Sequence, residues 1–509
     1  MYLGDHARIS PDKPALISVA TGEVLTYRQL NDRSIQLARH LHSRGLRRGD
    51  HVALLCENRT CFPEIVWATL RSGLYFTPIS RHVTADEAAY IVTNAGARAV
   101  LVSERYREIA RHLTRQMPIC THRMLIGGGL EGWTSYEAAL AEQDVEPMPR
   151  QWMGETMPYS SGTTGRPGSI KRKLQDATIE EANFPLGRRM GRFGFSGDTV
   201  HLCTAPLHHA ASLGYSIGTQ HLGGTVVMME RFDAETALAA IERHQVTHSQ
   251  WVPAMFVRLL KLPDSTRRRY DLSSMAVAIH AAAPCPMEVK RGMIDWWGER
   301  VHEYYGATER IGTTCISAAE WLAKPGSVGR PITGVPHICD EEGYEVAVGT
   351  IGQIYFELPP DGFEYHNDPE KSARARHPRH ADWGTVGDMG YLDADGYLFL
   401  IDRKAFIIVS GGVSIYPQAI EDALALHPLV GDAAVFGIPN EELGEEVKAV
   451  IELMPGIAPS DPVRESLLAF LRERIAAYML PRSIDFTRRL PRLPTGKLHK
   501  QPLKDRYWA

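Results

Sequence analysis

The sequence has few of the features that mark secreted, membrane or metal-cluster proteins. Its seven cysteines are spread over 509 residues without a C-x-x-C pair, which argues against a disulfide framework and a structural zinc site. No run of about 18 apolar residues predicts a membrane span. The first 15 residues include Asp5, Arg8, Asp12 and Lys13 and lack a long apolar region. We therefore expect no signal peptide and a cytoplasmic protein.

Neither sign of charge dominates the chain. Sixty acidic residues against 56 basic ones give a net charge of -4, so nothing favours nucleic acid or a membrane surface as a partner. Hydrophobic residues make up 44% of the sequence, as in ordinary globular proteins. At roughly 100–200 residues per domain, the length predicts a large domain and at least one more.

Helix-like and strand-like segments alternate in the first part of the chain. Residues 25–45 have apolar side chains at helical spacing, whereas 51–56 and 98–103 have the pattern of short buried strands. Such alternation predicts α/β layers with a largely parallel sheet. The composition shifts near Asp402, and a small βαβ-like domain of roughly 100 residues is expected after it. Its predicted elements are a helix at 417–426, strands at 432–438 and 447–454, and a helix at 462–477.

The segment Tyr159 to Arg172, YSSGTTGRPGSIKR, carries the strongest chemical signal. Its hydroxyl and glycine residues from Ser160 to Gly165 can present backbone and side-chain donors to phosphate oxygens. The segment is not a Walker A loop, because no Lys-Ser/Thr pair follows the glycines. A flexible linker rarely has two adjacent threonines beside an aromatic residue and a proline, so phosphate binding is the favoured interpretation.

Three later segments leave their interpretation open when each is read alone. In Tyr304 to Glu309, YYGATE, an aromatic ring can stack on a base and the glutamate can hold magnesium, but the segment also fits a capped helix start. Asp388 follows a glycine and either accepts from ribose hydroxyls or is a plain turn residue. Lys497 ends the tight turn PTGK and by itself reads as a solvated surface lysine.

Taken in order, these segments resemble the superfamily of adenylate-forming enzymes, which includes acyl-CoA synthetases, luciferases and peptide-synthetase adenylation domains. The resemblance runs from about residue 10 to 505. GLYFTPIS at 73–80 and HNDPEKSA at 366–373 look like bacterial fatty-acid-type CoA ligases. The matching segments are 159–168, 205–209, 281–284, 305–309, 329–331, 385–388, 402–403, 411–412, 415–417 and 494–497.

The resemblance implies both a fold and a reaction. The fold would be α/β, with a large multi-sheet N-terminal domain at 1–401, a hinge at 402–405 and a small mobile α+β C-terminal domain at 406–509. The reaction would convert a carboxylic acid and ATP to an acyl-AMP, with Mg²⁺, and pass the acyl group to coenzyme A. The small domain would rotate between the two steps, which brings the glycines after residue 410 to the pantetheine arm.

The resemblance also implies roles for single residues. Tyr305 would stack on adenine, the segment 281–284 would be a small-residue strand beside the base, and Lys497 would lie between the carboxylate and the α-phosphate. The catalytic residues would be Lys497, His209, Thr308 and Glu309, with Glu309 and Thr163 at the metal. The nucleotide site would comprise Ser161, Gly162, Thr163, Thr164, Gly165, Ala281, Ala282, Ala283, Tyr305, Gly306, Thr308, Asp388, Arg403 and Lys497. The acyl pocket would be formed by His208, His209, Trp251 and Ala307, the CoA channel by Ser410, Gly411 and Gly412, and the hinge by Lys404 and Ala405.

The phosphate loop departs from the family pattern G-x-P-K-G, because Gly168 and Ser169 stand where the family has lysine and glycine. The loop binds the β- and γ-phosphates, which are present only before pyrophosphate leaves. Loss of one such electrostatic donor costs up to about 3–4 kcal/mol. The departure therefore predicts weak or lost adenylation, retained thioester formation from a preformed acyl-AMP, and a partner enzyme that supplies it.

Three alternatives stay open at this point. The first is a complete two-step ATP-dependent ligase in which Lys171 or Arg172 replaces the missing charge. The second is an acyl-AMP ligase that loads a carrier protein. The third is a non-catalytic sensor of acyl nucleotides, which the retained Lys497 and Glu309 disfavour.

The substrate is expected to be a hydrophobic acid, either fatty or bulky and polycyclic. Amino-acid-activating relatives place an aspartate near the P-x-x-H segment, because a buried ammonium needs a carboxylate. Here His208-His209-Ala210-Ala211 follows Leu207, and the stretches 208–224 and 249–256 are small, apolar or aromatic.

Overall fold

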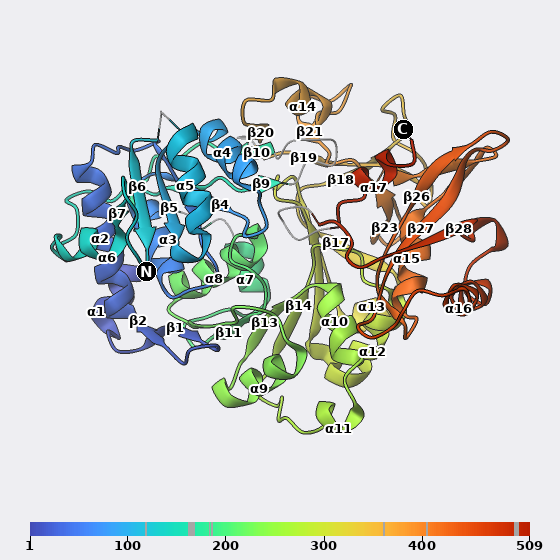
Figure 1. Ribbon diagram of the computed structural model, residues 1–509, viewed down its shortest axis with the longest axis horizontal. Helices are drawn as coiled ribbons and strands as arrows, with labels where there is room; N and C mark the ends of the chain where they lie inside the picture. Colours follow the sequence, from blue (N-terminus) through green and yellow to red (C-terminus); the bar gives the residue numbers. More distant parts are fainter. Residues whose placement is uncertain are drawn as a thin grey trace.

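The computed structural model of the chain describes residues 1–117, 120–160, 168–182, 184, 187–359, 362–403, 406–492 and 498–508. The first 400 residues form three sheets with their covering helices, and the elements from β24 onward, orange to red in Figure 1, pack at one side of them. Among all the residues that the structure describes, no helix is both long enough and apolar enough to cross a membrane.

A six-stranded parallel sheet lies near the N-terminus, with strand order β7-β6-β5-β3-β4-β8. Its central strands are buried along their whole length, which explains their continuous apolar sequences. The alternation expected from the sequence is confirmed. The strands are β3 (His51–Leu55), β4 (Tyr75–Ile79), β5 (Ala97–Ser103), β6 (His122–Ile126), β7 (Thr134–Ser135) and β8 (Glu155–Thr156), and the helices are α1 (Leu3–Ile9), α2 (Tyr27–Ser43), α3 (Cys61–Arg71), α4 (Ala85–Asn94), α5 (Arg107–Gln116) and α6 (Tyr136–Ala141).

A 14-stranded sheet forms the centre of the large domain. Its order is β18-β19-β22-β23-β17-β16-β15-β14-β13-β11-β12-β1-β2, with β21 beside β19. The strands from β12 to β15 run parallel, and the direction alternates from β16 onward. The parallel half comprises β1 (Pro14–Ser18), β12 (Thr225–Met228), β11 (Val200–Cys203), β13 (His248–Trp251), β14 (Val277–His280) and β15 (Val301–Gly306), and β2 (Val24–Thr26) is its antiparallel edge.

The antiparallel half is made of β16 (Thr313–Ser317), β17 (Ser327–Thr333), β18 (Pro336–Cys339), β19 (Gly352–Glu357), β21 (Trp383–Gly384), β22 (Asp388–Leu392) and β23 (Leu398–Arg403). The helices of this region are α7 (Gly187–Arg192), α8 (Ala210–Leu222), α9 (Ala234–His244), α10 (Pro253–Leu260), α11 (Asp264–Arg267), α12 (Met287–Trp297) and α13 (Ala318–Ala323). A short third sheet, β20-β10-β9, joins β9 (Tyr159–Ser160), β10 (Gly168–Lys171) and β20 (Glu364–Tyr365), and α14 (Pro369–Arg374) follows it.

The small C-terminal domain has a five-stranded sheet and its own apolar core. Long strands β26 and β27 pair antiparallel, and only β28 runs parallel to β27. The expected βαβ arrangement is therefore wrong for the first two strands, because a tight turn rather than a crossover helix connects them. The elements are β24 (Ile408–Ser410), β25 (Val413–Ile415), α15 (Pro417–Ala425), β26 (Val430–Asn440), β27 (Gly444–Leu453), α16 (Asp461–Arg472), β28 (Ser483–Thr487) and α17 (Gln501–Asp505).

Candidate active site

A cavity of about 2890 Å³ lies where the parallel strands of the central sheet end and the small domain begins. The loop after β15, the N-terminal turns of α8 and the segment Leu498 to Gln501 all contribute to its wall. Clefts at the carboxyl ends of parallel strands are the usual binding sites of α/β sheets. The cavity brings together most of the site residues expected from the sequence that the structure describes.

One corner of the cavity is a hydrogen-bonded triad of Tyr305, Asp388 and Arg403. The Tyr305 hydroxyl donates to Asp388 Oδ2 at 2.6 Å, and Arg403 Nε donates to Asp388 Oδ1 at 3.0 Å. Asp388 opens β22 and Arg403 closes β23, and the two are register partners. Burial and the neighbouring carboxylate raise the pKa of Tyr305 well above its ordinary value. A half-buried aromatic face beside a charged hydrogen-bonding pair is suited to a base and its ribose.

Thr308 and Glu309 follow β15 and face the same cavity. Glu309 is buried, and its Oε1 accepts a 2.7 Å hydrogen bond from the Tyr365 hydroxyl. The described residues contain no group of three or more metal-ligating side chains. Mg²⁺ takes few protein carboxylates and completes its shell with phosphate oxygens and water, so Glu309 fits as the carboxylate of such an ion.

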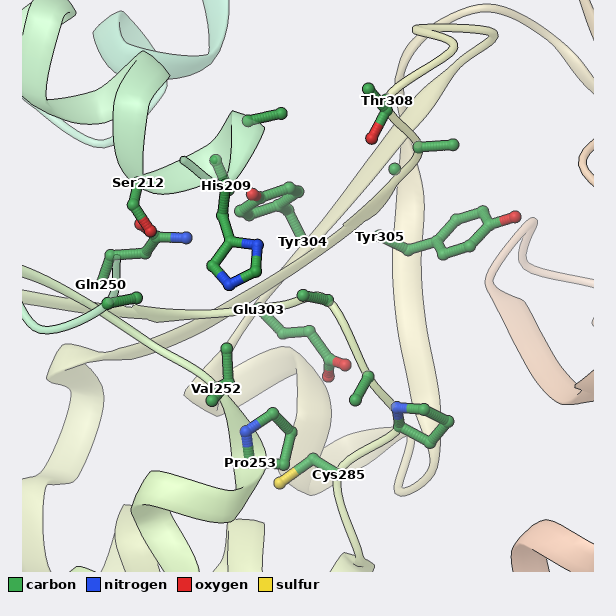
Figure 2. Close-up of a pocket in the computed structure, with 18 of the residues that line it drawn as sticks. His209, Ser212, Gln250, Val252, Pro253, Cys285, Glu303, Tyr304, Tyr305 and Thr308 are labelled. Atoms are coloured by element: carbon green, nitrogen blue, oxygen red, sulfur yellow. The ribbon is translucent and has the colours of Figure 1, made fainter. Parts of the chain in front are cut away.

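The part of the cavity that the sequence predicts to hold the acyl group begins at His209, which is the N-cap residue of α8. Figure 2 shows its imidazole projecting into the pocket between Ser212, Gln250 and Tyr304. His208 is buried behind it, with ring centroids 4.3 Å apart. Burial lowers the pKa of His208 well below its ordinary value, so this ring stays neutral. Gly306, Ala307, Val252, Pro253 and Cys285 add small or apolar surface.

Two expectations for this pocket need correction. Trp251 does not line the cavity, because successive strand residues point to opposite faces and its side chain is fully buried 5.2 Å from the Trp297 ring. Its neighbours Gln250 and Val252 line the pocket instead. Residues 281–284 are not a strand either: β14 ends at His280, and Ala282 has a φ of 76°. Ala282 and Ala283 line the cavity from this loop, whereas Ala281 is buried in an apolar cluster.

An unexpected cation lies at the wall of this part of the cavity. The guanidinium carbon of Arg189, on α7, is 4.2 Å from the ring centroid of Tyr304 and 5.1 Å from that of Tyr215. Its Nε is buried without a hydrogen-bond partner, and no carboxylate lies within 4.0 Å of it in the part of the chain that the structure describes. The sequence signal was weak: three arginines within 187–192 and no motif.

The altered loop is only partly in view, because Ser161, Gly162, Thr163, Thr164 and Gly165 lie outside the described residues. The same holds for Lys497 and for the hinge residues Lys404 and Ala405. Gly168 and Ser169 begin β10, and Ser169 does not have the positive φ that would have made its Cβ a source of strain. A serine therefore fits this position without backbone strain.

The two cations that follow the loop already have other partners. Arg172 Nη2 donates to the Thr308 carbonyl oxygen, and burial together with Arg310 lowers the pKa of Arg172 to about 10. Lys171 Nζ lies 5.1 Å from the ring centroid of Tyr75.

The proposed CoA-channel residues stand apart from this arrangement. Ser410 ends β24, and Gly411 and Gly412 form the turn to β25 with φ values of 57° and 80°. Both glycines are exposed and neither lines the cavity. The segment on the far side of Lys497, from Leu498 to Gln501, lines it instead. In this arrangement the segment from Leu498 to Gln501, and not the glycine turn, faces the site.

Comparison with known proteins identifies the family of the chain. The family described as AMP-binding enzyme matches residues 3–359, and the AMP-binding enzyme C-terminal domain matches residues 419–497. A feruloyl-CoA synthase from Amycolatopsis sp is 31% identical, covering 99% of this chain and 97% of its own. A fatty acid--[acyl-carrier-protein] ligase, ScoC, from Streptomyces coeruleorubidus is 29% identical over 99% of this chain and 95% of its own.

Among solved structures, ATP-bound MatB from Rhodopseudomonas palustris superposes with a TM-score of 0.80 at 26% identity, covering 100% of this chain and 99% of its own. The folds therefore agree over both domains. The chain belongs to the AMP-binding enzyme family, the superfamily of adenylate-forming enzymes, and is an acid–thiol ligase of its acyl-CoA ligase branch.

Proposed function

We propose that this protein is a complete two-step ligase that uses ATP, Mg²⁺ and a hydrophobic carboxylic acid to make an acyl-CoA. In the first step a carboxylate oxygen attacks the α-phosphorus, and the bond to the bridging oxygen breaks with release of pyrophosphate. In the second step the thiol sulfur attacks the acyl carbon, AMP leaves and one proton is released. The sums are acid and ATP to acyl-AMP and pyrophosphate, then acyl-AMP and CoA to acyl-CoA and AMP.

The observation that carries the proposal is the hydrogen-bonded triad of Tyr305, Asp388 and Arg403. The triad and Glu309 line the same cavity as the residues of the proposed acyl pocket. Asp388 would hold the ribose hydroxyls and Tyr305 the base. Glu309 would hold Mg²⁺, which neutralises phosphate charge when it is bound. Lys497 would bring its ammonium to the attacking carboxylate, as the cavity-lining position of Leu498 to Gln501 supports.

Two observations favour this reading over loss of the first step. Ser169 has no positive φ, so the serine that replaces the family's glycine adds no backbone strain at that position. The ATP-bound MatB structure has the same fold over the whole chain. Feruloyl-CoA synthase supports an aromatic or similarly bulky acid as the substrate and CoA as the thiol.

The acid itself would carry a hydrogen-bond acceptor at its far end. Arg189 places a partly buried cation against the aromatic rings of Tyr215 and Tyr304, at the wall that the acyl chain would reach. A ketone, hydroxyl or second carboxylate on an otherwise apolar skeleton would satisfy that guanidinium, and a plain alkyl chain would leave it without a partner.

A screen of carboxylic acids with ATP, Mg²⁺ and CoA, read by mass spectrometry, tests the reaction. Bulky apolar acids with a distal acceptor should give acyl-CoA and AMP, and α-amino acids should not be the best substrates. Lys497→Ala should reduce acyl-AMP formation far more than conversion of a supplied acyl-AMP to acyl-CoA. Equal losses in both steps would contradict the role of Lys497. Transfer to a carrier protein but not to CoA would instead favour a fatty acid--[acyl-carrier-protein] ligase activity, as named for ScoC.

A further inference from the structure

The ammonium group of Lys371 lies next to Gly168, the position at which the family's phosphate loop has its lysine. A Cβ built on Gly168 would lie 2.8 Å from Nζ of Lys371 and 3.9 Å from its Cδ. Lys371 belongs to α14, far from the loop in the sequence. Its ammonium therefore occupies the space into which a side chain at residue 168 would extend.

The backbone holds α14 at this place. Strand β20 pairs with β10 through Ile170 and Tyr365. The His366 amide donates to the Ser169 carbonyl oxygen at 2.8 Å, which continues the same pairing. Ser372 Oγ accepts from the Tyr365 amide at 2.9 Å and donates to the carbonyl oxygen of the residue that caps α14, also at 2.9 Å. Lys371 thus belongs to a segment that is hydrogen-bonded to β10, the strand that follows the phosphate loop.

The surroundings of the ammonium suit an anion. Nζ lies 4.2 Å from the ring centroid of Tyr365, whose hydroxyl donates to Glu309 Oε1. No carboxylate lies within 4.0 Å of Nζ in the residues that the structure describes. Burial lowers the pKa of Lys371, and the nearby negative charge of Glu309 acts in the opposite direction. Lys371 and Glu309 therefore both line the cavity, and the Lys371 ammonium also lies beside Gly168 at the end of the loop.

The alternatives for the missing charge lie elsewhere. Arg172 donates to the Thr308 carbonyl oxygen, and Lys171 faces the Tyr75 ring. Lys171 and Lys371 flank the same strand pair, but only Lys371 reaches the space beside Gly168.

We propose that Lys371 supplies, from α14, the positive charge that the phosphate loop lacks at Gly168, and that it binds the β- and γ-phosphates of ATP. The role rests on the proposed two-step function. As the bond between the α-phosphorus and the bridging oxygen breaks, its electron pair moves to pyrophosphate, and the Lys371 ammonium offsets that growing charge. Lys371 has no part in the second step, because pyrophosphate has left.

The test compares Lys371→Met with Lys171→Met, a matched loss of one lysine beside the same strand pair. Lys371→Met should lower kcat/KM for ATP in pyrophosphate exchange by about 100-fold, the usual cost of one electrostatic donor. It should weaken binding of MgATP in calorimetry by at least about tenfold, which is 1.4 kcal/mol. Thioester formation from synthetic acyl-AMP should stay within about twofold of the parent, which also shows that the variant is folded. Lys171→Met should leave all three values within about threefold.

Moving the charge back to the loop gives a second and independent readout. Gly168→Lys in the Lys371→Met background should recover at least about tenfold of the lost exchange. In the parent, the same substitution should give no gain, because its side chain would meet the Lys371 ammonium. Such non-additivity is expected if the side chains at residues 168 and 371 are in contact.

Three results would overturn the assignment. They are unchanged MgATP binding in Lys371→Met, equal losses in both half-reactions, and an equal gain from Gly168→Lys in both backgrounds. A parent protein that shows no exchange with any acid would instead refute the two-step function, and the MgATP binding comparison would still decide the role of Lys371.

Discussion

Replacement of Arg189 by methionine tests how the acyl pocket selects its acid. The change removes a guanidinium that packs 4.2 Å from the Tyr304 ring centroid and keeps a side chain of similar reach. A hydrogen bond from a charged donor contributes about 1.5–3 kcal/mol. Because 1.36 kcal/mol is a factor of ten in rate, the loss corresponds to about 10- to 150-fold in kcat/KM.

The assay uses pairs of acids that match in size and differ only in a distal ketone, hydroxyl or carboxylate. For Arg189→Met, kcat/KM of CoA thioester formation should fall for the member with the acceptor and stay within about threefold for its apolar partner. Arg192→Met is the control, since Arg192 is on the same helix but does not line the cavity. Equal losses for both members of a pair would show that Arg189 only supports the fold, and the reasoning about the pocket would be wrong.

Two further predictions concern the nucleotide corner and the small domain. Asp388→Asn keeps the shape but removes the charge that pairs with Arg403 at 3.0 Å, so it should raise Kd for AMP by about 10- to 100-fold; unchanged AMP binding in calorimetry would contradict the assignment. Burial raises the pKa of Glu421 to about 7. Between the ordinary pKa of a glutamate and pH 7, the folded chain therefore binds more protons than the unfolded chain. The free energy of unfolding then falls as the pH rises through this window. Glu421→Gln should flatten that fall in urea unfolding followed from pH 5 to 7.5, and a fall of the same size in the variant would exclude Glu421 as its source.

The sequence predicted the residues whose roles follow from short motifs. Tyr305, Asp388 and Arg403 were assigned from three separate segments, and the structure joins them by hydrogen bonds. The order of the motifs was enough to place these residues together, because each lies at or next to the end of its strand and these strand ends border the same cavity. Their individual roles in binding nucleotide stay predictions.

Other features depend on tertiary placement and could not be read from the sequence. Trp251 was expected in the pocket because it belongs to the apolar and aromatic stretch 249–256, but strand alternation turns its side chain into the core. Arg189 lies in no motif, and Lys371 lies in the segment 366–373, which indicated the branch of the family but no role for the lysine. Their proximity to the site depends on where α7 packs and on the pairing of β10 with β20. The antiparallel pairing of β26 and β27 was missed because apolar strands of similar length fit either direction.

The separate core of the small domain also bears on how stability is measured in this chain. Ile408, Val435, Ala449 and Leu467 belong to a buried cluster drawn only from residues beyond 406, while the large domain has several clusters of its own. Two cores of this kind need not melt together, so a thermal scan need not follow a single two-state transition. One unfolding free energy therefore does not describe the whole molecule. The effect of any substitution has to be referred to the cluster in which its residue is buried.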